Sequence, residues 1–506
     1  MGEEIRPGLS FRLPHTNNKN IFTIAILTGT FAILVMIVYR ILVIFSANAE
    51  VAAIDNNFVY AVIRRLGGYE LYGNPETSPY AINLYPPLYY NFCTAVARLL
   101  HVHTDEPLNV FRVCRAVSLL CDVVTCMFLY RSLRKNLGTQ KHLAIMATAS
   151  LAAIFCHLGY TFSRSDSLML AFYAGFFYLL TRPSLLQKKI NLVTLAIISV
   201  ACLFSKQNGI ILPLLAVSWL WIHNARKSVV MYLLFYAVSL IAVYFVYTGI
   251  LHYDYLQQNN VRALQNRIDF SWFYTDIFKR MMNSLWVLPV YIALIFSLRA
   301  WMKPSGNTVK SLSVIFLVQF TFSLFTSFKW GSGVSYFNES FYLSCFILCL
   351  VLNSVSAAFL KTCYVLFLPL FLLFIIHTCA QGYLFFLQNK EQKMADYRQQ
   401  IEIRNYLRPR LQDNLVFNLG DANASFLKVI LFRESAVPNL DMVNCCLLPD
   451  HTFDYSMLKK DFFTGHIAYL IKNANDPTES VWGIPLQQYR KDTTIGRFDI
   501  YKFHQP

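Results

Sequence analysis

The chain has 506 residues, of which 56% are hydrophobic and 14% are charged, whereas soluble domains carry about 45–50% apolar and about 25% charged residues. This balance excludes an ordinary soluble protein and predicts a chain that crosses a membrane several times. The formal net charge is +16, but the basic residues stand in short clusters between apolar runs. That placement is typical of membrane-protein loops and argues against a nucleic-acid-binding surface.

Apolar runs in chain order predict about eleven transmembrane helices, preceded by a cytoplasmic N-terminus at 1–20. The runs lie at about 21–46, 110–130, 142–158, 167–181, 191–204, 209–222, 229–250, 283–298, 311–327, 340–358 and 363–385. Several of them are shorter than the roughly 20 residues that an untilted span needs. The first run is too long for the apolar region of a cleavable signal peptide, so we expect it to remain as a span.

One further apolar stretch, 84–100, is predicted not to cross. Clusters of positive residues lie in the loops after every second apolar run. If the N-terminus is cytoplasmic and 84–100 does not cross the membrane, all of these clusters lie on the cytoplasmic side, as the positive-inside rule requires. If 84–100 crossed, they would lie outside. We therefore expect 84–100 to form a helix on the outer face. The positive residues that carry this inference are Arg131, Arg134, Lys135, Lys141, Arg182, Lys188, Lys189, Arg226, Lys227, Arg299, Lys303, Lys310 and Lys361.

The first outer loop, 47–109, is long and contains stretches with the spacing of interfacial helices. Glu50 and Asp55 follow the first span directly. A carboxylate at a membrane exit is a candidate general base. Asp55 is also a candidate helix cap, since "DNN" precedes an apolar helix. From spacing alone, the cap is the favoured role for Asp55.

Charged residues also gather in the other loops predicted on this face. Arg164 and Asp166 form either a local ion pair in a tight turn or a functional pair at the lipid–water boundary. Lys206, beside Gln207, either extends its ammonium to the interface or binds an anion such as a lipid phosphate. The same alternatives hold for the cations Arg112 and Arg115. Together these residues suit a reaction on an anionic headgroup.

The segment 386–506 is predicted to be a small soluble α/β domain outside the membrane. It is polar, with strand-like patterns at 414–419 and 497–503 and a helix-like stretch at 455–473. The 12 cysteines are mostly in apolar runs and show no Cys-x-x-Cys pair, so we expect packing residues and no zinc site.

These motifs, in this order, resemble the GT-C superfamily of glycosyltransferases that use polyprenyl-phosphate-linked sugars. The resemblance is closest to bacterial members related to the protein mannosyltransferases and the lipid A aminoarabinose transferase. It rests on Asp55 and Tyr60 with "GGYELY" and "YPPLYY", then on "FRVCRAVS", "SRSDSL", "SKQNG" and "GSGVSYFNES". These cues spread over residues 50–340, and the C-terminal domain has no comparable match.

The resemblance implies an inverting transfer at the outer face, with Asp55 as general base and Glu50 as the alternative. It implies that Asp166 positions the acceptor or a cation, and that cations stabilise the leaving lipid phosphate. It leaves room for a divalent cation but implies no cofactor. The implied phosphate-binding residues are Lys206, Arg164, Arg115 and Arg112; the implied cavity residues are Tyr60, Tyr85, Tyr89, Tyr90, Gln207, Tyr336 and Glu339.

The predicted enzyme works in the bacterial inner membrane, with 21–385 as its catalytic domain and the C-terminal domain in the periplasm. Its donor is a polyprenyl-phosphate-linked sugar and its acceptor a cell-envelope glycan or glycolipid, such as the O-antigen of lipopolysaccharide. The alternatives are a lipid or glycan transporter and a non-catalytic membrane scaffold for the outer domain. A transporter predicts inverted repeats and charges at the centre of spans; no repeat is apparent, and Asp122 is the one such charge.

Overall fold

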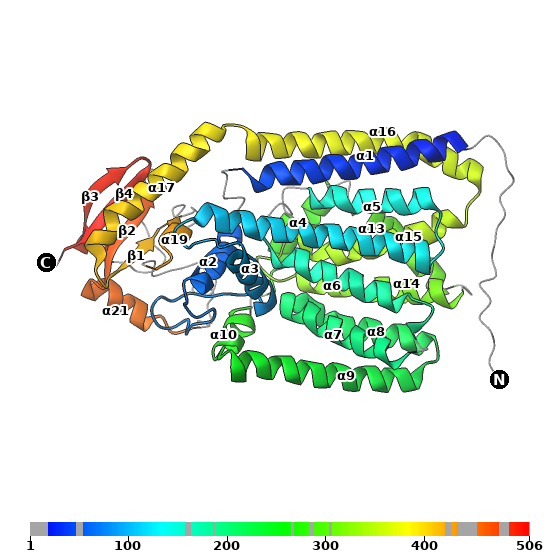
Figure 1. Ribbon diagram of the computed structural model, residues 1–506, viewed down its shortest axis with the longest axis horizontal. Coiled ribbons are helices and arrows are strands. Elements are labelled where there is room, and N and C mark those ends of the chain that lie inside the picture. Colours follow the sequence, from blue (N-terminus) through cyan, green and yellow to red (C-terminus); the bar gives the residue numbers. More distant parts are fainter. Residues whose placement is uncertain are drawn as a thin grey trace.

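The computed structural model describes residues 19–46, 54–156, 163–185, 188–264, 268–283, 287–302, 306–419, 427–433, 453–474 and 485–504. Long helices lie side by side in a bundle, and a small sheet domain caps one end of it (Figure 1). The described bundle helices are α1 (Lys19–Ile44), α4 (Pro107–Arg131), α5 (Lys141–Phe155), α6 (Ser165–Leu180), α7 (Lys189–Ser205), α8 (Leu212–Ile222), α9 (Arg226–Phe245), α13 (Leu288–Met302), α14 (Asn307–Ser327), α15 (Asn338–Asn353) and α16 (Ala357–Gly382).

Each bundle helix coincides with one of the predicted apolar runs. Within the described residues, six helical segments are long and apolar enough to cross a membrane, and five further apolar helices are shorter. The chain is therefore a multi-pass membrane protein. Eleven crossings, and the side on which the N-terminus lies, stay predictions.

The segment 84–100 does not add a helix to the bundle. Its helix α3 (Pro87–Leu99) lies beside α2 (Ile54–Leu66) at the end of the bundle that carries the sheet domain (Figure 1). Pro86 is extended and Pro87 occupies the first helical turn, where a missing N–H costs nothing. At only 13 residues α3 is too short to span. The short helices α10 (Leu256–Asn260), α11 (Phe270–Trp272) and α12 (Lys279–Met282) follow α9.

The C-terminal part begins with α17 (Lys390–Leu411) and contains α19 (Leu427–Ile430) and α21 (Ser456–Thr464). Its four described strands are β1 (Leu415–Asn418), β2 (Ile467–Asn473), β3 (Tyr489–Ile495) and β4 (Phe498–Phe503). They form one sheet in the order β1-β2-β4-β3, in which β1 and β2 are parallel and the other pairs are antiparallel.

The prediction of a helix through 455–473 is wrong in its second half. The helix α21 ends at Gly465, whose φ of +77° is left-handed, and β2 follows at once. A side chain at Gly465 would meet the ring of Phe503 at 2.5 Å, so this turn needs glycine. The predicted strands at 414–419 and 497–503 are confirmed as β1 and β4.

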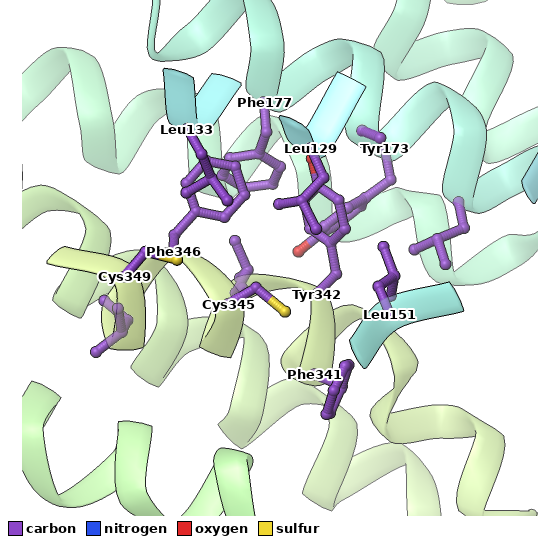
Figure 2. Close-up of a cluster of buried hydrophobic side chains, with 14 of the residues drawn as sticks. Leu129, Leu133, Leu151, Tyr173, Phe177, Phe341, Tyr342, Cys345, Phe346 and Cys349 are labelled. Carbon is purple, nitrogen blue, oxygen red and sulfur yellow. The ribbon is translucent and has the colours of Figure 1, made fainter. Parts of the chain in front are cut away.

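The bundle core is packed with aromatic and aliphatic side chains from α4, α5, α6 and α15 (Figure 2). Tyr173 meets Tyr342 edge to face at 5.7 Å between ring centroids, and Phe177 lies 6.1 Å from Phe346. Edge-to-face contacts of this kind add to the burial of apolar area. This packing fixes the position of α6, whose first turn carries the charged residue Asp166.

Candidate functional site

Three charged side chains from two predicted loops meet at the end of the bundle near α2 and α3. The Nζ atom of Lys206 lies 2.5 Å from Oδ1 of Asp166, and Nε of Arg164 lies 3.3 Å from Oδ2 of the same carboxylate. Arg164 precedes α6, Asp166 is in its first turn, and Lys206 follows the last residue of α7. Of the two alternatives for Arg164 and Asp166, the ion pair is present, and Lys206 joins it.

The backbone around Lys206 turns tightly enough to bring it to Asp166. After α7 ends at Ser205, a short 3-10 turn over Gln207–Ile211 leads into α8. A side chain at Gly209 would meet backbone atoms of Cys202 at 2.5 Å. Only glycine therefore permits this close return of the chain, and the glycine in "SKQNG" sets the position of the lysine before it.

The ion cluster is almost closed to solvent, since Lys206 is 3% exposed and Asp166 5%. Burial lowers the pKa of Lys206, but the carboxylate of Asp166 more than offsets this and holds that pKa above its usual range. The ammonium therefore stays charged. A buried cation that is held by a carboxylate is a fixed positive charge, and such charges stabilise anions with little reorganisation.

Aromatic and acidic side chains surround Lys206. Its ammonium lies 5.3 Å from the ring centroid of Tyr336, within cation–π range. Tyr85 and the buried Glu339 lie within electrostatic range of Lys206. Burial raises the pKa of Tyr85 to about 12, so its hydroxyl remains a hydrogen-bond donor. The structure thus brings four of the predicted loops to one place.

Asp55 forms a second buried centre, on α2. It lies in the first turn of this helix and is fully buried. Its charge acts on Arg115 of α4, whose guanidinium donates to the carbonyl of Val43 at 2.6 Å and to Oγ of Ser46 at 3.1 Å. Arg115 thereby ties the end of α1 to the start of α2. The alternative base, Glu50, lies outside the described residues.

Aromatic stacking connects these two centres. Phe58, one helical turn after Asp55, stacks on Tyr85 with ring centroids 4.7 Å apart. Tyr85 in turn lies beside Lys206. Hydrogen bonds link α3 to the residue before α6. The hydroxyl of Tyr89 shares a 3.0 Å hydrogen bond with Ser118, which also accepts from the backbone N–H of Arg164 at 3.4 Å.

The remaining predicted residues support this arrangement or lie apart from it. Gln207 donates to the carbonyl of Leu84 at 2.5 Å and so holds the segment that leads to Tyr85. Tyr90 packs on Phe58 at 5.5 Å. The hydroxyl of Tyr60 accepts from Arg64 on its own helix. Arg112 donates to Asn109 at 2.8 Å, and no described contact brings Tyr60 or Arg112 to Lys206.

Asp122 was singled out from the sequence, but its partner and several other side chains near the site were missed. Arg40 of α1 lies 2.8 Å from Asp122 of α4 and donates to the carbonyl of Phe155 at 2.6 Å. Both members are buried, and their only sequence signal is a charge within an apolar run. Phe58 and Ser118 did not stand out in the sequence, because aromatic residues and serines are common in packed helices. No group of three His, Cys, Asp or Glu residues that could hold a metal occurs in the described part of the chain.

Comparison with known proteins finds one related sequence family. Residues 86–252 match the sequence model of the dolichyl-phosphate-mannose-protein mannosyltransferase family. No curated protein is similar enough in sequence to count as a relative.

Solved structures of the same fold cover nearly the whole chain. The crystal structure of ArnT from Cupriavidus metallidurans bound to undecaprenyl phosphate is 12% identical, with a TM-score of 0.61 over 93% of this chain and 97% of that one. The oligosaccharyltransferase of Archaeoglobus fulgidus is also 12% identical, with a TM-score of 0.55 over 88% of this chain and 68% of that one. At this level of identity the likeness to solved structures concerns the fold. The chain therefore has the GT-C fold seen in ArnT, and its residues 86–252 are similar in sequence to the protein mannosyltransferases.

Proposed function

We propose that this protein is a glycosyltransferase that moves a monosaccharide from a polyprenyl-phosphate donor to a hydroxyl group of a cell-envelope glycan or glycolipid, such as O-antigen. The observation that carries this proposal is the buried Lys206–Asp166–Arg164 cluster beside Tyr85. A lipid phosphate that leaves in the reaction needs fixed positive charge and hydrogen-bond donors. The cluster offers two cations, only partly neutralised by one carboxylate, and a protonated phenol.

The proposed chemistry is a single displacement with inversion. The acceptor oxygen attacks the anomeric carbon, and the bond from that carbon to the phosphate oxygen breaks. Asp55 takes the proton of the acceptor hydroxyl, and the polyprenyl phosphate leaves with the bonding electrons and an additional negative charge. General-base catalysis of this kind contributes about 10²–10⁴-fold.

Each charged residue has a proposed role in this displacement. Lys206 and Arg164 stabilise the charge on the leaving phosphate, while Asp166 holds both of them in place. Arg115 lies within the electrostatic reach of Asp55 and orients the first turn of α2. Glu50 is retained as the alternative base, and Arg112 as an outer cation for the approaching headgroup.

The comparisons support a lipid-phosphate donor. ArnT was crystallised with undecaprenyl phosphate, and the archaeal oligosaccharyltransferase AglB was solved with dolichol phosphate and an inhibitory peptide, with a TM-score of 0.55 and 11% identity. By the same analogy we propose a bacterial inner membrane, a cytoplasmic N-terminus and a periplasmic C-terminal domain. The positive loops 131–141, 182–189 and 226–227 support this orientation.

Binding of polyprenyl phosphate tests the proposed donor site directly. We expect undecaprenyl phosphate to raise the thermal denaturation temperature of the purified protein in detergent. Lys206→Met should weaken this effect about 10-fold or more in lipid concentration, because a charge-assisted phosphate contact is lost. Lys310→Met, at the exposed start of α14, is the matched control and should bind as the native protein does. Equal binding by the native protein and Lys206→Met would refute the site.

A further inference from the structure

The C-terminal domain packs against the end of the bundle that carries the candidate site. Its core beneath the sheet includes Tyr80 and Ile82 of the first loop, together with Phe417 and Leu458. The hydroxyl of Tyr80 donates to Asp461 of α21 at 2.6 Å. The segment that leads to Tyr85 is therefore anchored in this domain.

A second contact reaches the helix that carries the proposed base. Lys428 lies in α19 and is 1% exposed. Among its interactions is a hydrogen bond from Nζ to Oδ1 of Asn57, which stands two residues after Asp55 in the first part of α2. A buried ammonium is costly unless it is hydrogen-bonded, so this contact fixes α19 against α2.

Apolar side chains that flank Lys428 strengthen the same contact. Val429, Ile430 and Phe432 belong to the hydrophobic cluster that contains Phe58 and the apolar face of α2. The ring of Phe432 also meets Tyr69 edge to face at 6.1 Å. Burial of these three apolar side chains in the same cluster as the apolar face of α2 stabilises the packing of α19 on α2. The Lys428 amine is therefore placed by packing as well as by its hydrogen bond.

We propose that Lys428 of the C-terminal domain is a positioning residue for glycosyl transfer. It holds the first turn of α2, and through it Asp55, in register with the cluster around Lys206. This inference rests on the proposed function for its effect on catalysis. The anchoring of α2 by Lys428 is a structural statement that stands independently of the substrate.

The test compares three full-length variants with the native protein. Lys428→Met removes the ammonium and keeps the apolar stem, Lys428→Arg keeps the charge and the donors, and Lys460→Met is an exposed control in α21. Two readouts are needed: transfer kinetics with a polyprenyl-phosphate sugar, and hydrogen–deuterium exchange of peptides that cover α2.

We expect Lys428→Met to lower kcat about 10- to 100-fold, since small misplacements of a catalytic group have effects of this size. The KM for the donor should change by less than about twofold, because the contact of Lys428 with Asn57 acts on α2 and not on the cluster around Lys206. Exchange in α2 should become faster while exchange in α15 stays unchanged. Lys428→Arg should recover most of the activity, and Lys460→Met should behave as the native protein.

Unchanged exchange in α2 of Lys428→Met, or native kcat in that variant, would overturn the proposal. Loss of kcat with faster exchange throughout the bundle, and without recovery in Lys428→Arg, would also overturn it, because the residue would then serve only the fold. If the native protein transferred no sugar, the proposed function would fail. The exchange of α2 would then decide by itself whether Lys428 anchors the helix.

Discussion

Lys206 and Asp166 are forty residues apart in the chain, yet their charged atoms lie 2.5 Å apart in a buried cluster. Arg164 also contacts Asp166, so the carboxylate has two cationic partners, whereas Lys206 has one carboxylate at salt-bridge distance among the described residues. Removing the carboxylate of Asp166 and removing the ammonium of Lys206 should therefore affect the stability of the protein differently. The first prediction uses this asymmetry.

Asp166→Asn should destabilise the protein more than Lys206→Met. The first change leaves Lys206 buried without its carboxylate, and breaking a buried ion pair on one side costs about 3–5 kcal/mol. The second change leaves Asp166 with Arg164, which limits the loss. Thermal denaturation in detergent measures both variants, and the double variant Lys206→Met/Asp166→Asn should be closer to the native protein than Asp166→Asn alone. Equal denaturation temperatures for the two single variants would contradict the assigned partners.

Asp55→Asn should abolish most transfer without unfolding the protein. The side chain keeps its size, but an amide does not accept the acceptor proton, so the rate should fall about 10²–10⁴-fold. Asp254→Asn, which changes an exposed acid, is the matched control. The parallel variant Glu50→Gln tests the alternative base. Near-native turnover in Asp55→Asn together with inactive Glu50→Gln would transfer the role to Glu50.

Phe58→Leu should lower transfer with little loss of stability. The substitution is close in volume and costs less than about 1.5 kcal/mol in a typical core. It removes the stacking that holds Tyr85 within electrostatic range of Lys206. We expect turnover to fall about 10-fold through misplacement of the tyrosine. Phe346→Leu, which changes an equally buried aromatic in the bundle core, is the matched control and should keep near-native turnover.

The buried Arg40–Asp122 pair should show strong coupling in a double-mutant cycle. Arg40→Met and Asp122→Asn each leave a buried charge without its partner and should each cost about 3–5 kcal/mol. The double variant removes both charges and should recover much of that loss. Expression level and denaturation temperature in detergent report the result. Additive losses in the double variant would show that the two side chains do not act as a pair.

Much of the fold could be predicted from the sequence because apolar runs and loop charges are strong signals. Helix α3 is an example. The positions of the positive loops predicted that it does not cross the membrane, and the structure places it beside α2 at one end of the bundle (Figure 1). The second half of 455–473 shows the opposite case. Its apolar residues fit a helix by number, but the left-handed Gly465 ends α21 and the segment continues as β2.

From the residues alone, without the family resemblance, the candidate site stood out only where charge was unusual. Arg164, Asp166 and Lys206 stood out as charges in short loops between apolar runs, and the structure joins them. Phe58 and Lys428 did not stand out. Their roles depend on which distant segments fold against α2, and a single sequence without tertiary contacts holds no local signal of that packing.

The central claim is most directly tested by a transfer assay on the purified full-length protein with a panel of undecaprenyl-phosphate-linked sugars. Mass spectrometry follows the release of undecaprenyl phosphate and the addition of a monosaccharide to envelope glycans, and NMR gives the anomeric configuration of the product. We predict transfer from at least one donor with inversion, and its loss in Asp55→Asn and Lys206→Met. Folded protein that releases no undecaprenyl phosphate from any donor in the panel would contradict the proposed function.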